Sequence, residues 1–296
     1  MILAAIDIGS NAARILVCEV IKNGTEVHFE KLNLLRIPLR LGFDVFTKGI
    51  VGAKKKKMLN NTVKTFDQLM KVYDVDHYMA CATSAMRDAS NGQEIINEIK
   101  QETDIEIEII SGQLEAEIIY ENHIAEMLND STSYLYIDVG GGSTELTFFA
   151  NGALVSKESF NIGTIRLLKN QIKEKTWDDM KDYVKKHIKS ELPSIAIGSG
   201  GNITKILSMS RLKEGKPLSL DLLKDYYKEL SNVTIEDRMN LYGLKEDRAD
   251  VIVPALLIYV QIMKWASIDE IYVPKIGLVD GLIHHLYDQV GNISVT

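Results

Sequence analysis

The chain is poor in cysteine: its 296 residues include only two, Cys18 and Cys81. Both lie in apolar stretches, and neither has the neighbouring Cys or His residues of a metal-binding cluster. This usage argues against a disulfide framework and against a thiolate metal site. We expect two buried thiols in a protein of the reducing cytoplasm.

Proline and long apolar runs are also scarce. Five prolines and the absence of a Gly/Ser-rich tract argue against a disordered linker. No apolar run approaches the roughly 20 residues that span a bilayer. Residues 1–5 lack a basic leader and are followed too soon by Asp7 to form a signal peptide. We therefore expect no membrane partner and a strand at the start of the chain.

Positive charge is in deficit, since the net charge is −7. An acidic protein is a poor generic binder of nucleic acid, so no nucleic-acid partner is expected. A phosphate site must then be built locally from N–H groups, a metal ion and a few placed cations. The dense basic run Lys54–Lys57 is interpreted first as the solvated start of a helix. A landing strip for a long anionic substrate is the alternative.

Several common catalytic patterns are missing. The sequence contains no Walker A motif, no HExxH motif, no Rossmann fingerprint and no convincing Ser-His-Asp or Cys-His set. His284 and His285 lie on a predicted terminal helix without a nearby carboxylate pattern, so surface or packing roles are favoured for them. The chemistry must be sought in the glycine-rich segments.

One glycine motif occurs twice. Residues 5–11 read AIDIGSN and residues 136–144 read YIDVGGGST. Each is a β-branched run that ends in Asp, then Gly, then small hydroxyl or amide residues. A strand that stops at an Asp and turns through glycine presents backbone N–H groups beside a carboxylate, which suits a phosphate with its metal ion. The repeat suggests two half-domains that face one another across a phosphate.

These loops supply candidate ligands. Taken alone, Asp7 could be a simple turn former. Three consecutive glycines after a strand weaken a fold, however, unless a ligand approaches the backbone closely. The expected phosphate ligands are Ser10, Asn11, Gly141, Gly142 and Ser143. The expected hard-oxygen ligands of Mg²⁺ are Asp7, Asp138 and Glu145.

Two further segments follow predicted strands. Gly198–Asn202 precedes a helix, and N–H groups at a helix start favour anions. Gly200 and Asn202 are therefore candidate phosphate ligands, although a plain strand-to-helix turn fits equally well. Arg87 follows a buried strand, and an arginine at the carboxyl end of a strand in an α/β sheet points at the usual ligand crevice. A surface pair of Arg87 with Asp88 or a glutamate is the alternative.

Two glutamates follow another strand end. Glu115 and Glu117 lie on different faces of the helix that follows Gly112, so they are not expected to act together. A carboxylate opposite a bound phosphate could orient and deprotonate an attacking water. Acids that complement the dipole of the helix start are the alternative. Spacing alone does not choose between the two residues.

The length and layout indicate an α/β protein of two domains. Each half begins with a strand meander whose first hairpin holds the Asp-x-Gly motif, and then alternates helices with strands. We expect domain I at residues 1–127 and domain II at 128–296, with the last helix packing back toward domain I as an option. The hinge is expected at residues 127–133. A cleft between the domains is the expected place for a small-molecule site.

Apolar periodicity predicts the individual elements. In the first half we expect strands at 2–8, 14–20, 26–34, 77–83 and 106–110, and helices at 54–72, 91–103 and 113–128. A turn at Asn23-Gly24 is expected to join two antiparallel strands. In the second half we expect strands at 133–139, 145–150, 154–159, 194–197 and 270–273. Helices are expected at 177–190, 203–208, 220–231, 249–266 and from 279 onward.

These motifs, in this order, resemble the exopolyphosphatase/guanosine pentaphosphate phosphatase (Ppx/GppA) family of the actin-like superfamily. The resemblance covers nearly the whole chain, as a short form without the C-terminal helical domains of longer relatives. It is carried by residues 5–11, 39–42, 82–89, 110–112, 138–145, 198–201, 248–252 and 277–281. It implies two actin-like, ribonuclease H-like α/β domains.

The resemblance also implies roles for residues. The family's Ser-Gly-x-Glu-Glu-Ala segment corresponds here to residues 111–116 and retains its second glutamate as Glu115. Glu115 is thereby implied as the general base, and Arg87 as the clamp on the phosphate. These roles agree with the chemistry, because hydrolysis of a phosphoanhydride needs an in-line water and spread charge neutralisation.

Two departures from the family pattern stand out. Leu114 replaces the first glutamate of that segment, which removes an acid near the base. Residues 277–281 read GLVDG where the family favours Gly-Leu-Arg-Glu-Gly. Val279 therefore takes the place of an arginine, and a substrate or interdomain contact of the family is altered.

The function implied is that of a Mg²⁺-dependent exopolyphosphatase that releases terminal orthophosphate, with a preference for short chains. Guanosine pentaphosphate 5′-phosphatase is the alternative. A nucleotide-linked phosphotransferase, which would bind nucleotide at Gly198–Asn202, and a non-catalytic phosphate sensor are further alternatives. A base such as Glu115 counts against a sensor. A homodimer would suit the family.

Overall fold

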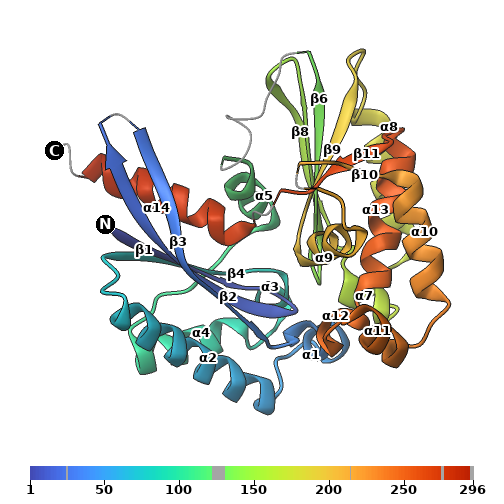
Figure 1. Ribbon diagram of the computed structural model, residues 1–296. Helices are drawn as coiled ribbons and strands as arrows, with labels where there is room; N and C mark the ends of the chain where they lie inside the picture. Colours follow the sequence, from blue (N-terminus) through green and yellow to red (C-terminus); the bar gives the residue numbers. More distant parts are fainter. Residues whose placement is uncertain (25, 122–130, 214, 275–276, 294–296) are drawn as a thin grey trace. The chain divides into compact units, whose positions relative to one another are not determined.

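The computed structural model describes residues 1–24, 26–121, 131–213, 215–274 and 277–293, and the chain divides into two compact units, each with its own sheet (Figure 1). Unit 1 comprises Met1–Ala125 and Gly277–Thr296, and unit 2 comprises Glu126–Ile276. The sequence predicted a division after residue 127 and left the side of the last helix open; in the structure that helix belongs to unit 1. Most of the expected hinge, and the end of the helix expected at 113–128, lie outside the described residues.

The sheet of unit 1 has the strand order β3-β2-β1-β4-β5. An antiparallel meander of β1 (Ile2–Ile8), β2 (Ala12–Asn23) and β3 (Glu26–Pro38) is extended by β4 (His77–Ala82) and β5 (Glu108–Ile109), which run parallel to β1. The β2–β3 pairing ends at Asn23 opposite Glu26, and Gly24 has φ +66°. This pairing confirms the predicted turn. Glycine suits the position because it adopts a positive φ without strain.

Helices cover both faces of this sheet (Figure 1). They are α1 (Leu41–Lys48), α2 (Ala53–Val72), α3 (Ser84–Asp88), α4 (Gly92–Thr103), α5 (Gly112–Glu121) and α14 (Leu278–Ile293). Leu3 and Ala5 of β1 share a buried cluster with apolar residues of α5 and α14. Ala4 and Ile6 alternate to the opposite face and are also fully buried. A strand buried on both faces explains the continuous apolar run at the start of the chain.

The basic run Lys54–Lys57 lies in the first turns of α2, as the first interpretation predicted. Lys55 Nζ donates to the carbonyl oxygens of Leu39 at 2.9 Å and Arg40 at 2.6 Å. Lys56 Nζ pairs with Glu98 at 2.6 Å. Two of the four ammonium groups are thus engaged within unit 1, which disfavours the landing-strip alternative.

The sheet of unit 2 repeats this topology, in the order β8-β7-β6-β9-β11-β10. An antiparallel meander of β6 (Ser133–Val139), β7 (Thr144–Ala150) and β8 (Ala153–Phe160) is joined by β9 (Ser194–Ser199) and β11 (Glu270–Tyr272), which are parallel to β6, and by the short β10 (Leu218–Ser219). The α/β prediction is confirmed: both units have the actin-like order of an antiparallel meander continued by parallel strands.

The helices of unit 2 are α7 (Thr164–Leu168), α8 (Glu174–His187), α9 (Gly201–Ser210), α10 (Leu220–Ser231), α11 (Ile235–Tyr242), α12 (Glu246–Ala249) and α13 (Ile252–Ala266). Alternate residues of β6 and β7 share the main core of this unit with α8, α10 and α13. Leu135, Ile137, Leu146 and Phe148 belong to that face. Asp138 and Glu145 alternate to the other face.

One helical stretch among the described residues, Glu246–Ala266, is long and apolar enough to cross a membrane by length and composition. The expectation that no apolar stretch approaches this length was therefore too strong. However, 67% of its apolar window is buried inside the protein. Ile258, Tyr259 and Ile262 of α13 belong to the main core of unit 2, so this helix has the features of a core helix.

Candidate active site

Three parallel strands of unit 1 end at one edge of the sheet. The register pairs Ile8 of β1 with Ala82 of β4, and Ala82 with Ile109 of β5. The segments that follow these residues are Gly9–Asn11, Thr83–Arg87 and Ile110–Glu115. The carboxyl ends of parallel strands are the usual place for ligand-binding residues in α/β sheets. All predicted site residues of unit 1 other than Asp7 lie in these segments, and Asp7 is the next-to-last residue of β1.

The first hairpin places Asp7 directly opposite Arg14. Arg14 Nη1 donates to Asp7 Oδ2 at 2.7 Å, and the Asp7 side chain is almost fully buried. Burial raises the pKa of the Asp7 carboxyl, while the neighbouring Arg14 guanidinium acts in the opposite direction. Asp7 therefore already has a cationic partner within its own hairpin, and sequence reasoning missed Arg14.

The loop after Asp7 is supported from two sides. Ser10 Oγ lies 2.7 Å from Ser84 Oγ at the start of α3. The Ser10 carbonyl accepts from the Gly42 amide at 2.9 Å, and the Asn11 carbonyl accepts from the Arg40 amide at 2.8 Å. Residues at the start of α1 thus fix the loop carbonyls and hold the loop in one conformation.

Arg87 lies on α3 and is tied to the next strand end. Its Nη1 atom donates to the Ile110 carbonyl at 2.7 Å. Ile110 in turn donates its amide to Ala82 at 3.0 Å. The guanidinium is therefore fixed at the edge where the parallel strands end.

Glu115 and Glu117 differ clearly in exposure. Glu115 is 8% exposed and lies in the first turns of α5, whereas Glu117 is exposed. Glu115 contributes with Asp7 to the raised pKa of the Cys81 thiol, although burial is the largest cause. Glu115 is thus the glutamate on the inner side of α5. Leu114, which departs from the family pattern, packs against the apolar cluster of α5 and α14.

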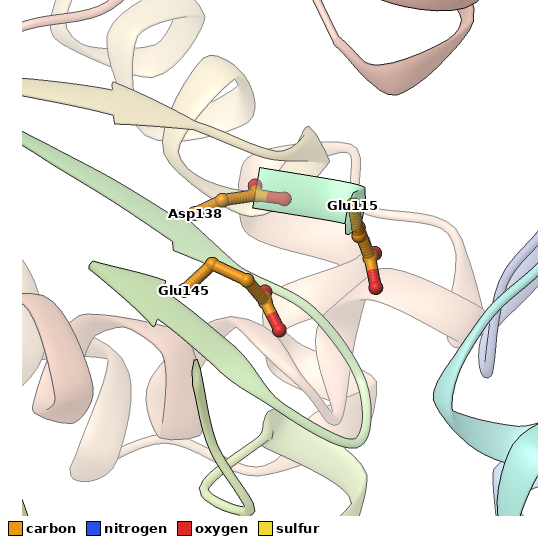
Figure 2. A group of neighbouring side chains, drawn as sticks. All are labelled: Glu115, Asp138 and Glu145. Carbon is orange, nitrogen blue, oxygen red and sulfur yellow. The ribbon is translucent and has the colours of Figure 1, made fainter. Parts of the chain in front are cut away.

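In unit 2, four polar residues form a row across the sheet. Asp138 of β6 lies opposite Ser199 of β9 on one side and opposite Glu145 of β7 on the other. Glu145 in turn lies opposite Ser159 of β8. Directly opposite residues share a face of a sheet. Figure 2 draws the side chains of Asp138 and Glu145 on neighbouring strands, and also labels Glu115 of α5.

The carboxylates of this row accept hydrogen bonds from its serines. Ser199 Oγ donates to Asp138 Oδ1 at 2.7 Å, and Ser159 Oγ donates to Glu145 Oε1 at 2.9 Å. Like charges directly opposite one another destabilise a sheet. The half-buried Asp138 carboxylate and the buried Glu145 carboxylate lie side by side with a hydroxyl donor on each flank, and together they form a hard-oxygen set of the kind that Mg²⁺ prefers. The residues present therefore fit a divalent cation.

The glycine loop of unit 2 has its carbonyl groups bonded from behind. The carbonyls of Gly140 and Gly141 accept from the amides of Thr164 at 3.0 Å and Ile165 at 2.8 Å, and Gly142 accepts from Arg166 Nε at 2.6 Å. Among the described residues, the Gly141, Gly142 and Ser143 amides donate no hydrogen bond. A peptide whose carbonyl is held on one side presents its N–H on the other, as a phosphate loop requires.

Gly163 allows the start of α7 to lie close against the glycine loop. A Cβ atom at Gly163 would lie 2.5 Å from carbonyl carbons of Gly141 and Gly142. Only a residue without a side chain allows the start of α7 to approach the loop this closely. Neither Gly163 nor Arg166 was identified from the sequence, since no local pattern indicates a contact between segments so far apart in the chain.

The third glycine segment is partly occupied by an arginine. Arg248 Nη1 donates to Asn202 Oδ1 at 3.2 Å, and a Cβ at Gly201 would lie 2.2 Å from the Arg248 guanidinium. Gly201 therefore makes room for an arginine of the same unit. Gly200, with φ +105°, lies beside Asp138: a Cβ there would be 3.2 Å from Asp138 Oδ1. This arrangement disfavours a nucleotide pocket built on Gly201.

Val279 and Asp280 show what replaces the arginine and glutamate favoured by the family. Val279 is buried in the apolar cluster of unit 1. Asp280 Oδ1 pairs with Lys31 Nζ at 2.5 Å, and its other oxygen accepts from the Gly277 amide at 2.8 Å. Both residues serve the packing and capping of α14 within unit 1.

Two like α/β units, each opening with an aspartate-glycine hairpin, define an actin-like class of protein. The model of the Ppx/GppA phosphatase family matches residues 20–290, so the chain belongs to this family.

Named relatives include a bifunctional 3-dehydroquinate synthase/phosphatase of Fusobacterium nucleatum, which is 30% identical over 92% of this chain and 44% of its own length. Exopolyphosphatase 1 of Mycobacterium tuberculosis is 23% identical over 96% of this chain and 87% of its own length. A guanosine-5′-triphosphate,3′-diphosphate pyrophosphatase of Pseudoalteromonas translucida is 24% identical over 99% of this chain and 60% of its own length. The chain thus spans less than half the length of the first of these relatives.

Solved structures with a similar fold include members of the same family. An exopolyphosphatase from Cytophaga hutchinsonii has a TM-score of 0.85 and 26% identity, with 98% of each chain covered. The Ppx/GppA family member of Aquifex aeolicus has a TM-score of 0.76 and 23% identity, again with 98% of each chain covered. The second likeness concerns the fold alone.

Proposed function

We propose that this protein is a Mg²⁺-dependent exopolyphosphatase that releases terminal orthophosphate from inorganic polyphosphate by water attack. The observation that carries the proposal is the pair of half-buried Asp138 and buried Glu145, which lies beside a glycine loop whose carbonyls accept hydrogen bonds from the start of α7. A carboxylate pair for a cation and a set of backbone donors for phosphate oxygens are the two parts that phosphoryl transfer needs. The exopolyphosphatases among the relatives support this choice of substrate.

Unit 1 supplies the proton acceptor and the arginine in this proposal. Glu115 orients a water and takes its proton as the water attacks the terminal phosphorus. Arg87, fixed by the Ile110 carbonyl, contacts the phosphate oxygens on which charge develops. Ser10 and Asn11 donate to the same phosphate. Asp7 is the weakest of the proposed metal ligands, because its carboxylate is already paired with Arg14.

Unit 2 supplies the cation site and the backbone donors. Asp138 and Glu145 hold Mg²⁺, which when bound neutralises charge on the phosphate oxygens. The amides of Gly141, Gly142 and Ser143 orient those oxygens, and the Ser143 hydroxyl adds a donor. Gly200 and Asn202 are proposed as additional phosphate ligands. In Asn202 the side-chain amide nitrogen is the group for this role, because its oxygen accepts from Arg248.

Guanosine pentaphosphate 5′-phosphatase is the second candidate, supported by relatives that are named as guanosine-5′-triphosphate,3′-diphosphate pyrophosphatases. Both reactions remove a terminal phosphoryl group, so the same residues serve either. A panel of short and long polyphosphates, guanosine pentaphosphate and ATP, with Mg²⁺ varied, separates them. The highest kcat/KM on polyphosphate is expected. A higher value on guanosine pentaphosphate selects the second candidate, and no phosphate release from any substrate rejects both.

We also propose a cytoplasmic location and a homodimer. Two buried free cysteines suit a reducing compartment. The dimer follows the family resemblance, and sedimentation of the purified chain at several concentrations tests it. A single species of monomer mass throughout would reject the dimer without affecting the proposed chemistry.

A further inference from the structure

Each of the two central carboxylates of the row in unit 2 accepts a hydrogen bond from a serine on the neighbouring strand. Ser199, Asp138, Glu145 and Ser159 come from four adjacent strands and are paired in direct register. Ser199 donates to one oxygen of Asp138, and Ser159 donates to one oxygen of Glu145. The row is symmetric in chemistry: an acid pair in the middle and a hydroxyl donor on each side.

Ser199 is itself fixed from the core. The hydroxyl of Tyr259, which is 1% exposed, donates to the Ser199 carbonyl. Ser199 is 4% exposed, so its hydroxyl has little freedom to turn toward water. A chain of contacts therefore runs from α13 through Ser199 to Asp138. Ser159, by contrast, is half-buried on the edge strand β8.

Hydrogen bonds of this kind limit the rotation of a carboxylate side chain. A side chain that is left to itself turns its two oxygens among several orientations, and two adjacent carboxylates turn away from each other because they repel. A donor on the outer flank of each carboxylate engages a defined oxygen and limits that rotation. Partners of metal-binding carboxylates act in this way in many metal sites.

We propose that Ser159 and Ser199 are positioning residues that orient Glu145 and Asp138 for a divalent cation. The proposal rests on the proposed function in one respect, the assignment of the acid pair as the cation site. It goes further because it assigns the affinity for the cation in part to two serines that do not bind the phosphate.

The experiment measures Mn²⁺ binding to the full-length chain by calorimetry and by electron paramagnetic resonance, without substrate. The variants are Ser159→Ala and Ser199→Ala. Loss of such a positioning partner typically weakens metal binding about 10- to 100-fold, and we expect a weakening in that range for each. Ser159→Thr, which keeps the hydroxyl on a strand, should bind Mn²⁺ within about threefold of the unmodified protein by the same reasoning.

A matched control exists on the same strand as Asp138. Ser133 is fully buried, and its hydroxyl donates to Ser190 Oγ at 2.6 Å. It lies about 17 Å along β6 from Asp138 and on the opposite face. Ser133→Ala therefore removes an equivalent hydroxyl bond away from the row, and its Mn²⁺ affinity should equal that of the unmodified protein.

The outcomes separate this proposal from the proposed function. If the unmodified protein and Asp138→Asn both fail to bind Mn²⁺, the cation site of the proposed function is rejected, and the role of the serines with it. If the unmodified protein binds, Asp138→Asn does not, and both serine-to-alanine variants bind normally, only the serine proposal is overturned. If Ser159→Ala and Ser159→Thr lose affinity equally, the hydroxyl is not the cause, and the proposal is also overturned.

Discussion

The hairpins that open the two units share a backbone hydrogen bond in the loop, but the residues opposite their aspartates carry opposite charges. In each, a glycine amide closes the loop on the carbonyl of a residue further along it, from Gly9 to Ala12 at 3.0 Å and from Gly140 to Ser143 at 3.0 Å. Each aspartate lies opposite one residue of the next strand. In unit 1 that residue is a cation, Arg14, and in unit 2 it is an anion, Glu145. One strand position therefore gives Asp7 a cationic partner within its own hairpin, whereas it gives Asp138 an acidic neighbour, with which we propose that it binds a cation.

The loops are also supported differently. In unit 1, residues at the start of α1 donate backbone amides to the loop carbonyls, and Lys55 in turn donates to the carbonyls of Leu39 and Arg40 just before that helix. In unit 2, the start of α7 supplies amides and the side chain of Arg166 reaches Gly142 directly. Three consecutive glycines lack side chains that would limit their conformations, so the unit 2 loop depends more on support from behind. Four experiments test this comparison.

The largest effect is expected for the base in unit 1. Glu115→Gln keeps the size of the side chain and removes its ability to accept a proton. Phosphate release from polyphosphate should fall about 10²- to 10⁴-fold, the usual contribution of a general base. Stopped assays of kcat at saturating Mg²⁺ measure this. Mn²⁺ binding should persist in this variant, because the proposed cation ligands Asp138 and Glu145 belong to unit 2.

Glu117→Gln is the matched control, since Glu117 is an exposed glutamate on the same helix. It should retain the activity of the unmodified protein. Equal losses in both variants would mean that α5 contributes through its overall charge. Normal turnover by Glu115→Gln would remove the residue from the mechanism.

The next effect tests the opposite charges of the two hairpins through stability. Arg14→Leu leaves the buried Asp7 carboxyl without its guanidinium partner, which should lower the free energy of unfolding by about 1–3 kcal/mol. Glu145→Gln removes a like-charge pair and, without divalent cations, should raise stability by about 0.2–1 kcal/mol. Urea unfolding with EDTA measures both. If the two variants change stability in the same direction, the proposed contrast is wrong.

Added Mg²⁺ extends this test. A cation that binds only the folded protein stabilises it by mass action. The unmodified protein and Arg14→Leu should both gain stability as Mg²⁺ is titrated, whereas Glu145→Gln should gain much less. A full Mg²⁺ response in Glu145→Gln would place the cation elsewhere.

Much of this arrangement could be predicted from the sequence, because its signals are local. The Asp-x-Gly repeat, the apolar runs around it and the helix period at Ile95, Ile96 and Ile99 each depend on residues close together in the chain. The charge of the residue opposite each aspartate could also have been found. In a hairpin with a known loop the register follows by counting, which leads from Asp7 to Arg14 as it leads from Asp138 to Glu145.

What could not be predicted depends on pairing between distant segments. Ser199 meets Asp138 through a parallel crossover whose register no local pattern fixes. Gly163 and Arg166 meet the glycine loop through a helix of five residues, too short to show a period.

A smaller effect is expected for the support of the unit 2 loop. Arg166→Met removes the donor to the Gly142 carbonyl, and a hydrogen bond from a charged group contributes about 1.5–3 kcal/mol at most. Since the loop is proposed to bind phosphate, KM for polyphosphate should rise about threefold to tenfold, with a smaller change in kcat. Lys173→Met removes the same charge from an exposed position nearby and should leave KM unchanged. An equal rise in both variants would indicate long-range charge rather than support of the loop.

The smallest effect concerns the support of the unit 1 loop and appears as a dependence on pH. Burial is the main reason why the pKa of the Lys55 ammonium is lowered from 10.5. The unfolded chain therefore binds this proton more tightly than the folded chain, so protonation disfavours folding. Stability should rise slightly as pH increases from the lowered pKa toward 10.5. Lys55→Met should abolish this rise in urea unfolding series, whereas Lys57→Met, at an exposed position of the same helix, should preserve it. If the rise in stability with pH survives in Lys55→Met, another group titrates. The buried Lys55 ammonium would then not be a difference between the support of the unit 1 loop and that of the unit 2 loop.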